Sequence, residues 1–386
     1  MKQNWPLLAF TYLLRQSYIK FRIRIRQWGH LPAKRGPTVL ITNHQHMDEG
    51  ENITARTFLL HPWKRLLMCN SRRTFETGFI AARLPWSARF TRRLNLSGLW
   101  AAYGVLPIEN HLFSRPLISL AEELFETHGD LALETILPAD AIARLGLEDC
   151  SLSSLWKLEN FMRAQEWVKI AQLKQPYRRE VLENLRTVTQ RDVAAIVEHV
   201  RSGATFYVTP EGDFSRDGRM HPMRGGIVDA LAPFADLWLC AVAYDPFQGG
   251  RLSMLYRVLP YAGGADIGTS LAAQRPITTS ALLGAFLLEG TEAFAVEDAV
   301  RSVRARLDSL PDSVFVDPEL RRKPDVTVAK ALATLRRRGT LAGNGAGYRL
   351  TAMRTDSRFP HVADMIEYQR NMLDETLASD RRLRGV

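Results

Sequence analysis

Apolar residues along the chain follow patterns that predict a series of β-strands. Residues 21–29 alternate Phe21, Ile23 and Ile25 with arginines, which is the two-residue period of a half-buried strand. Continuous apolar runs that end in turn residues predict further strands. These runs lie at residues 38–43, 103–110, 204–212 and 237–244.

Helical periodicity fills the intervals between these strands, for example at residues 116–126 and 193–201. Alternating strands and helices predict an α/β fold with a mixed, largely parallel sheet flanked by helices, and with ligands near the carboxyl ends of the strands. Residues 127–192 show no strand pattern. We therefore expect a domain formed by residues 21–126 and 193–265, with a helical insertion at 127–192.

The two ends of the chain predict separate elements. In residues 1–20, aromatic residues and leucines recur at helical spacing, which favours an amphipathic helix on a membrane surface. A helix that covers the core and a cleaved signal peptide remain alternatives. The uncharged run at 3–14 is 12 residues long, whereas a bilayer span needs about 20. Residues 266–319 predict a helical connector, and residues 320–386 a small winged-helix-like appendage of helices and a Gly-rich hairpin.

Composition excludes several classes of protein. The chain has 386 residues, of which 46% are hydrophobic and 24% charged, and a mean hydropathy of -0.16, so it is neither a fibrous nor a polytopic membrane protein. The three cysteines are far apart, which fits a reducing, cytoplasmic setting. The net charge of +10 is concentrated at residues 1–108, which hold 17 Lys and Arg and four acids. This uneven charge predicts an anionic partner.

Candidate chemistry begins directly after the strand at 38–43. His44 is followed by Asp48 and Glu49, and a histidine held by a carboxylate is suited to act as a general base. A strand-to-helix turn capped by Asn43 or Asp48 is the purely structural alternative. His46 with Glu51 repeats the spacing of His44 and Glu49.

The same stretch also has the spacing of metal ligands. His44, His46 and Asp48 resemble the HxHxDH motif of metallo-β-lactamase-like hydrolases, with Glu49 in place of the last histidine. Such a site needs further histidines in suitable loops downstream, and the sequence does not supply them. A metal-dependent hydrolase is therefore kept as an alternative, and no bound metal is expected.

A second polar segment follows the strand predicted at 204–212. It reads Thr-Pro-Glu-Gly-Asp-Phe-Ser-Arg-Asp-Gly-Arg at 209–219 and continues to Arg224 and two glycines before a helix. Such a segment can form a cleft at the edge of the sheet, where glycines let a ligand approach the backbone. By itself the Pro-Glu-Gly triplet mostly marks a turn.

Taken together, the two segments resemble the glycerolipid acyltransferase superfamily, the lysophosphatidic acid acyltransferase-like group. That family has an NHxxxxD block, a G-x-[IL]-x-[IV]-[DE]-R block, an FPEGTRSRxGxL block and an apolar strand, in this order. The matching stretches are Asn43-His44, residues 104–110, residues 210–225 and residues 239–244. The resemblance covers roughly residues 20 to 260 and is interrupted by the helical insertion.

The resemblance implies transfer of a fatty acyl group from an acyl thioester, acyl-CoA or acyl carrier protein, to a hydroxyl, with no other cofactor. His44 would be the base, and the family spacing assigns its acid to Glu49, with Asp48 as the alternative. The other positions that the motifs place at the substrate are Asn43, Glu109, Asn110, Glu211, Gly212, Asp213, Phe214, Ser215, Arg216 and Arg224.

Departures from the family pattern concern the acceptor. Asn110 and Phe214 stand where the family has arginines that are expected to hold a phosphate, and Asp213 adds a negative charge. Arg216 and Arg224 remain as possible phosphate ligands. The acceptor is therefore either lysophosphatidic acid-like or a molecule without a phosphate, such as a neutral glycolipid, a sugar or a terpenoid with a hydroxyl. Phe214 either contacts that acceptor or packs in the core.

The expected partners are a membrane lipid surface and the acyl donor, on the cytoplasmic side of the membrane as a peripheral protein. The basic run Arg336-Arg337-Arg338 in the C-terminal appendage resembles that of a winged helix, but docking of an acidic acyl carrier protein or packing on the catalytic domain fits its charge better than nucleic acid does. The sequence leaves the oligomeric state open.

Overall fold

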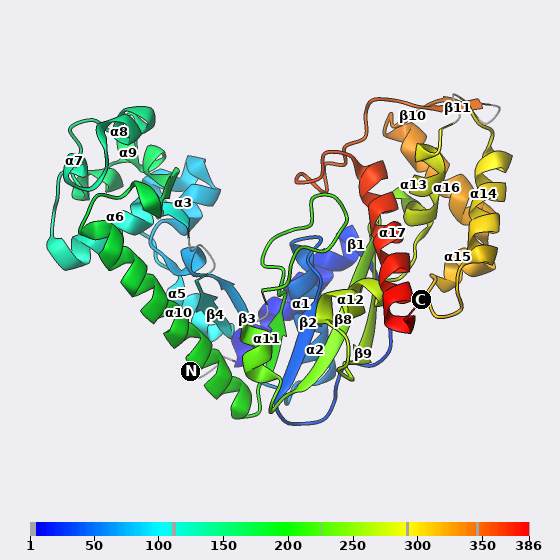
Figure 1. Ribbon diagram of the computed structural model, residues 1–386, viewed down its shortest axis with the longest axis horizontal. Coiled ribbons are helices and arrows are strands. Elements are labelled where there is room, and N and C mark those ends of the chain that lie inside the picture. Colours follow the sequence, from blue (N-terminus) through cyan, green and yellow to red (C-terminus); the bar gives the residue numbers. More distant parts are fainter. Residues whose placement is uncertain (1–4, 110–112, 225, 291–292, 345–346, 386) are drawn as a thin grey trace. The chain divides into compact units, whose positions relative to one another are not determined.

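A computed structural model describes residues 5–109, 113–224, 226–290, 293–344 and 347–385 (Figure 1). The chain forms two compact units. The smaller unit comprises residues 1–8 and 67–199, and the larger unit comprises residues 9–66 and 200–386. Each unit buries its own set of apolar side chains.

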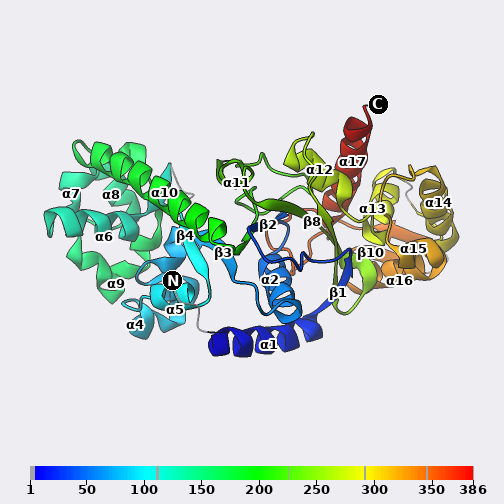
Figure 2. The same ribbon diagram turned by 90° about the horizontal axis from the view of Figure 1, so that it is seen from below.

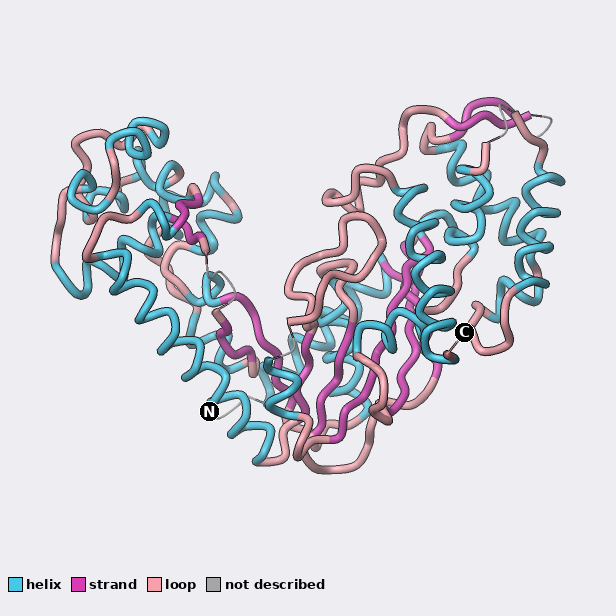
Figure 3. Tube along the Cα trace, in the orientation of Figure 1, coloured by secondary structure: helices cyan, strands magenta, loops and turns pink. Residues whose placement is uncertain are grey.

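The larger unit is built on a mixed, largely parallel sheet flanked by helices, which confirms the predicted α/β class (Figure 3). Its strands lie side by side in the order β1 (Ile23–Trp28), β9 (Leu252–Pro260), β8 (Asp236–Asp245), β2 (Thr38–Thr42) and β7 (Thr205–Val208). The pairs β1–β9, β8–β2 and β2–β7 are parallel, and β8–β9 is antiparallel. All residues of β2 and β7 are buried, as expected for strands covered on both faces.

Helices cover both faces of this sheet. In Figure 2, α2 lies on one face, and α11 and α12 lie on the other. The helices and the small hairpin of this unit are α1 (Trp5–Arg22, which starts in the smaller unit), α2 (Asp48–Leu60), α11 (Gly226–Leu231), α12 (Ile267–Gln274), α13 (Thr279–Leu288), α14 (Val296–Ser309), α15 (Pro318–Arg322), α16 (Pro324–Arg337), β10 (Leu341–Asn344), β11 (Gly347–Leu350) and α17 (Met365–Arg384).

The C-terminal residues differ from the predicted separate appendage, because residues 200–386 form one compact unit. The helix and hairpin of the winged-helix-like pattern are present as α16, β10 and β11, but α17 packs along α12 and α13 (Figure 1). This packing is close: a Cβ on Gly284 of α13 would lie 3.0 Å from the Ile366 carbonyl oxygen of α17. The C-terminal helix is therefore part of the body that carries the sheet.

The smaller unit contains the parallel pair β3 (Leu66–Ser71) and β4 (Val105–Ile108) and a helical core. Its helices include α3 (Phe79–Arg83), α4 (Ala88–Thr91), α5 (Ser97–Ala102), α6 (Leu117–His128), α7 (Leu133–Ile136), α8 (Ala139–Leu145), α9 (Leu158–Phe161) and α10 (Tyr177–Arg201, which ends in the larger unit). The segment 127–192 is mostly helical. It also holds a short strand that the pattern does not predict, β6 (Trp167–Lys169), which pairs with β5 (Ser114–Pro116).

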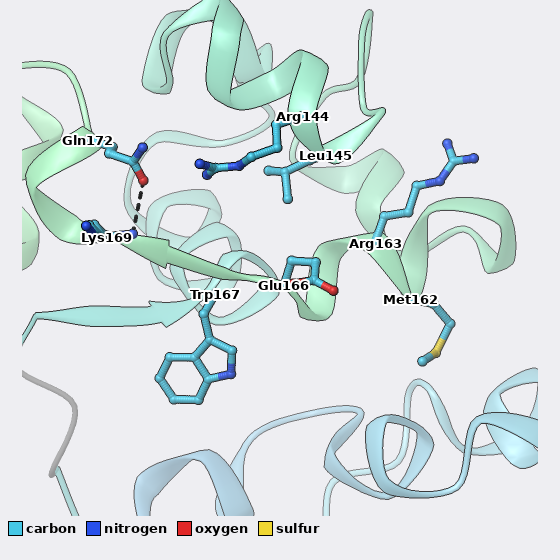
Figure 4. A pocket seen from close by; sticks show the side chains of 8 residues that line it. All are labelled: Arg144, Leu145, Met162, Arg163, Glu166, Trp167, Lys169 and Gln172. Atoms are coloured by element: carbon cyan, nitrogen blue, oxygen red, sulfur yellow. Dashed lines mark hydrogen bonds between the residues drawn. The ribbon is translucent and has the colours of Figure 1, made fainter.

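An open groove of about 670 Å³ lies on the insertion (Figure 4). Arg144, Arg163 and Lys169 line it, together with Trp167. Figure 4 shows the guanidinium of Arg144 extended toward Gln172 and Lys169. Glu166 also lines the groove, so the three cations leave it with a net positive charge.

Helix α1 has one buried and one exposed apolar face. Leu8 and Tyr12 are buried, and the Tyr12 ring packs 5.2 Å from Phe58 of α2. On the opposite face, four of the large apolar side chains whose burial is described form a stripe that faces solvent: Phe10, Leu13, Leu14 and Phe21. The helix continues through Arg22, so Phe21 is helical and the predicted strand begins only at Ile23. Within the described part of the chain, no helix combines the length and the apolar character that crossing a membrane requires.

Candidate active site

The two polar segments predicted from the sequence meet at one edge of the larger unit. β2 and β7 are neighbouring parallel strands, so the loops that follow them, residues 43–47 and 209–224, leave the sheet on the same side (Figure 3). This is the edge where α/β sheets commonly bind ligands.

Asn43 fastens the first loop to the sheet. Its side-chain Nδ2 donates to the Val242 carbonyl oxygen at 3.0 Å, and its Oδ1 accepts from the Val242 N–H at 2.7 Å. The amide therefore continues the pairing of β2 with β8 beyond the last residue of β2. Asn43 is fully buried, and these two hydrogen bonds fix the chain directly before His44.

His44 and Glu49 form a hydrogen-bonded pair. His44 Nδ1 lies 3.1 Å from Glu49 Oε2, and the other carboxylate oxygen accepts the backbone N–H groups of Gln45 and His46, each at 2.8 Å. Glu49 is completely buried, and burial raises its pKa to about 7 although these hydrogen bonds oppose the shift. Glu49, and not Asp48, is thus the acid in contact with His44.

The second ring nitrogen of His44 is available for chemistry. No protein group in the described ranges hydrogen-bonds to Nε2, and the side chain keeps 21% of its surface exposed. A carboxylate on Nδ1 fixes the tautomer with the proton on Nδ1, so that Nε2 can accept a proton. This arrangement suits a general base.

His46 and Asp48 form a different, structural pair. His46 Nδ1 accepts the Asp48 backbone N–H at 3.2 Å and lies 3.5 Å from its carboxylate, while Nε2 donates to the Arg358 carbonyl oxygen at 3.1 Å. Burial lowers the pKa of His46, which favours the neutral ring. Both nitrogens are therefore occupied within the protein. Among the residues with a described position, no three His, Cys, Asp or Glu side chains are arranged to hold a metal ion.

Glu211 joins the two loops to each other. One oxygen accepts the His44 backbone N–H at 2.6 Å, and the other accepts the His221 backbone N–H at 2.8 Å. Burial raises the pKa of this carboxyl, against the effect of the two hydrogen bonds. The glutamate of the Pro-Glu-Gly triplet thus acts as a buried bridge that fixes the backbone of His44, although the motif places it at the substrate.

The loop after Glu211 has a defined backbone. Ser215 N–H donates to the His44 carbonyl oxygen, and the buried Ser215 hydroxyl donates to the Arg219 carbonyl oxygen and accepts the Gly218 N–H. Gly212 and Gly218 have φ of +70° and +90°. A Cβ on Gly218 would lie 2.1 Å from the Tyr368 carbonyl oxygen, so only glycine fits there. The hydrogen bond to His44 and the close contact with Tyr368 of α17 therefore fix the backbone of this loop.

Phe214 covers the candidate base and does not pack in the core. Its ring centroid lies 4.1 Å from that of His44, with the two ring planes tilted by 38°, and 5.1 Å from that of His361, on which it stacks. His221 Nε2 lies 3.1 Å from the Phe214 carbonyl oxygen. An apolar ring thus lines the approach to His44.

Three other predicted residues of this loop have exposed side chains. Asp213, Arg216 and Arg224 are exposed on the same loop, and Arg224 lies over Gly212. Glu109 is buried in the smaller unit, where its charge acts on Arg115, and Asn110 lies outside the described residues.

C-terminal residues complete the site, and sequence reasoning does not find them. Arg275, only 1% exposed, donates to the Gly218 and Met372 carbonyl oxygens and forms a 2.7 Å ion pair with Glu375. Glu375 also accepts the Met220 backbone N–H. No local motif marks Arg275, Glu375 or His361, because their partners lie tens to hundreds of residues away.

Replacing Arg275 by methionine is expected to lower the free energy of unfolding by about 3 kcal/mol, since the change leaves Glu375 unpaired and two carbonyl oxygens without a donor. Arg370→Met, which removes an exposed ion pair with Asp374, should cost less than about 1 kcal/mol. Urea unfolding monitored by circular dichroism measures both. Equal losses in the two variants would contradict the structural role of Arg275.

Comparison with known proteins gives no relative: a scan against models of protein families finds no match, and a search of curated proteins finds none.

Proposed function

We propose that the chain is an O-acyltransferase that moves a fatty acyl group from an acyl thioester to the hydroxyl of a lipid acceptor, with the fold of the glycerolipid acyltransferases. The observation that carries the proposal is the His44–Glu49 pair, whose free Nε2 lies beside the loop that Glu211 connects to it. Two motifs that resemble the same family therefore occupy one site.

The proposed reaction needs only this pair and the two substrates. Nε2 of His44 removes the proton of the acceptor hydroxyl as the oxygen attacks the thioester carbonyl, and Glu49 stabilises the imidazolium. The tetrahedral intermediate then collapses, the C–S bond breaks, and the thiolate takes the proton from His44. The products are one ester and one thiol, from either acyl-CoA or acyl carrier protein.

The acceptor is proposed to place an apolar group next to its hydroxyl. Phe214 lies directly on the His44 ring and offers such a group a contact surface. Arg216 and Arg224 are exposed nearby on the chain and could still hold a phosphate. A lysophosphatidic acid-like acceptor and a lipid without a phosphate therefore both remain to be compared by experiment.

We also propose that the protein works as a peripheral protein at the inner face of the membrane. The exposed apolar stripe of α1 supports this, because such a stripe beside arginines and lysines suits the interface of an anionic bilayer. The lipid substrates would be reached from that surface.

The metal-dependent hydrolase receives less support from the geometry. A metal held by His44, His46 and Asp48 would have to displace the hydrogen bond of His46 to Arg358 and its contact with Asp48. A catalytically inactive homologue would retain the fold and bind lipid without turnover.

The test is a search for the product. Purified protein is incubated with mixed acyl-CoAs, or with acylated carrier protein, and a total lipid extract, and new esters are identified by mass spectrometry. We expect an acylated lipid that forms with the wild type and not with His44→Ala. Absence of any His44-dependent ester with either donor would refute the transferase, and release of fatty acid alone would indicate a hydrolase.

The pH dependence follows from Glu49. Its pKa of about 7 means that the Glu49 carboxyl is protonated at lower pH. The protonated carboxyl is no longer a charged hydrogen-bond acceptor for His44 Nδ1, so kcat/KM should rise with pH through about 7. Stability should change in the opposite sense: the contribution of protonated Glu49 is present below its ordinary pKa of 4.5 and is lost as the pH rises through about 7. A pH–rate profile that stays flat from about 5.5 to 8.5 would contradict this assignment.

A further inference from the structure

Two neighbouring aromatic side chains of the smaller unit are almost fully exposed, as is Phe113 elsewhere in this unit. Trp86, in the 3-10 turn Pro85–Ser87, exposes 81% of its surface, and Phe90, in α4, exposes 82%. They are four residues apart in consecutive helical turns and project from one face. Leu84 and Leu94 flank them and are also exposed. These four side chains, here called the Trp86 patch, are exposed apolar groups of one short segment, and a concentration of this kind marks an interaction surface.

The backbone beneath the patch is firmly packed. Ala81 and Ala88 belong to the buried core of this unit. The Ser87 hydroxyl donates to the Leu84 carbonyl oxygen at 2.8 Å, and the Thr91 hydroxyl donates to that of Ser87 at 3.0 Å. The aromatic rings therefore project from a rigid base, and their exposure is not the result of a poorly packed segment.

Arginines are interspersed with the patch along the chain, and this segment contains no acid. Residues 77–108 contain four arginines and no Asp or Glu. Arg92 has a structural role, because it donates to the Trp156 and Arg89 carbonyl oxygens. Arg89 and Arg93 are exposed, and neither forms an ion pair with any carboxylate in the described parts of the chain.

We propose that the Trp86 patch docks on an anionic lipid bilayer, with Trp86 and Phe90 in the interface and Arg89 and Arg93 against the headgroups. Aromatic side chains favour the membrane interface, and each cation near an anionic surface strengthens binding by roughly fivefold. Side chains with such a high exposed fraction can insert into a lipid bilayer, because lipid molecules rearrange around them. A folded protein partner would need a preformed pocket for each ring. The inference does not rest on the proposed function, and it concerns residues separate from the stripe of α1.

The test is sedimentation of the full chain with sucrose-loaded vesicles, either of phosphatidylcholine alone or with about 30 mol% phosphatidylglycerol. We expect the wild type to prefer the anionic vesicles. Trp86→Ser with Phe90→Ser should weaken binding to them by at least about tenfold. Arg89→Glu with Arg93→Glu should weaken it by about 25-fold or more, and added salt should reduce the difference.

Two matched controls change exposed residues outside the patch. Phe125→Ser removes an aromatic side chain of α6, and Arg186→Glu reverses a charge on α10. In Figure 2, α10 lies on the opposite side of this unit from α4. Both should bind vesicles like the wild type. Measuring the same variants in a Phe10→Ser, Leu14→Ser background separates the patch from α1. Unchanged vesicle binding in both patch variants, the result expected for a protein partner, overturns the proposal, as does a wild type that does not bind. Transfer to a detergent-dispersed acceptor should not change, which keeps this test apart from that of the enzyme activity.

Discussion

His44→Ala is expected to lower kcat/KM for acyl transfer by about 10³-fold without unfolding the protein, because general-base catalysis contributes about 10²- to 10⁴-fold. The fold should tolerate the change, since the interactions of residue 44 with Glu211 and Ser215 use its backbone N–H and carbonyl groups, which alanine retains. Steady-state kinetics with an acyl-CoA and the identified acceptor measure the loss.

The control for this variant is His30→Ala, which removes an exposed histidine of the same unit and should leave kcat/KM unchanged. Circular dichroism and urea unfolding check that both variants are folded. If His44→Ala retained more than about a tenth of the wild-type activity, another group would have to be the base.

Glu49→Gln is expected to lower kcat/KM by about 10²- to 10⁴-fold, through the tautomer of His44. The introduced amide can keep its oxygen on the Gln45 and His46 N–H groups only by turning its NH₂ group toward His44 Nδ1. Nδ1 must then accept a hydrogen bond, the ring proton moves to Nε2, and the base is lost.

Asp48→Asn is the matched comparison, because it changes the adjacent acid by the same single substitution. Asp48 contacts His46 and not His44, so kcat/KM should stay within about threefold of the wild type. The two variants measured side by side decide which acid serves the base. A larger loss in Asp48→Asn than in Glu49→Gln would reverse the assignment.

The sequence predicts the parts of the fold that follow from local periodicity. The strands at 38–43, 204–212 and 237–244 are confirmed as β2, β7 and β8, because an apolar run between turn residues has few alternatives to a buried strand. β3 and β9 are not predicted. In β9, Arg257 interrupts the apolar pattern. The strand accommodates this residue because its guanidinium packs over the ring of Phe315, which lies 58 residues further along the chain.

Local sequence patterns likewise predict only part of the candidate site. The spacing of His44 and Glu49 within one turn and the start of a helix can be read locally, and the structure brings these two together. The buried bridge of Glu211, the clamp of Arg275 and the stacking of His361 on Phe214 depend on how distant segments pack. Such contacts leave no periodic signal in a single sequence, so the C-terminal part of the site could be found only from the structure.

The most direct test of the proposed chemistry is the product balance of one reaction. The thiol released from acyl-CoA, the new ester and the free fatty acid are measured together, for the wild type and for Glu49→Gln. The account predicts one ester for each thiol, little fatty acid, and loss of both products in the variant. Thiol release matched by fatty acid and not by ester, or ester formation that Glu49→Gln leaves unchanged, would contradict it.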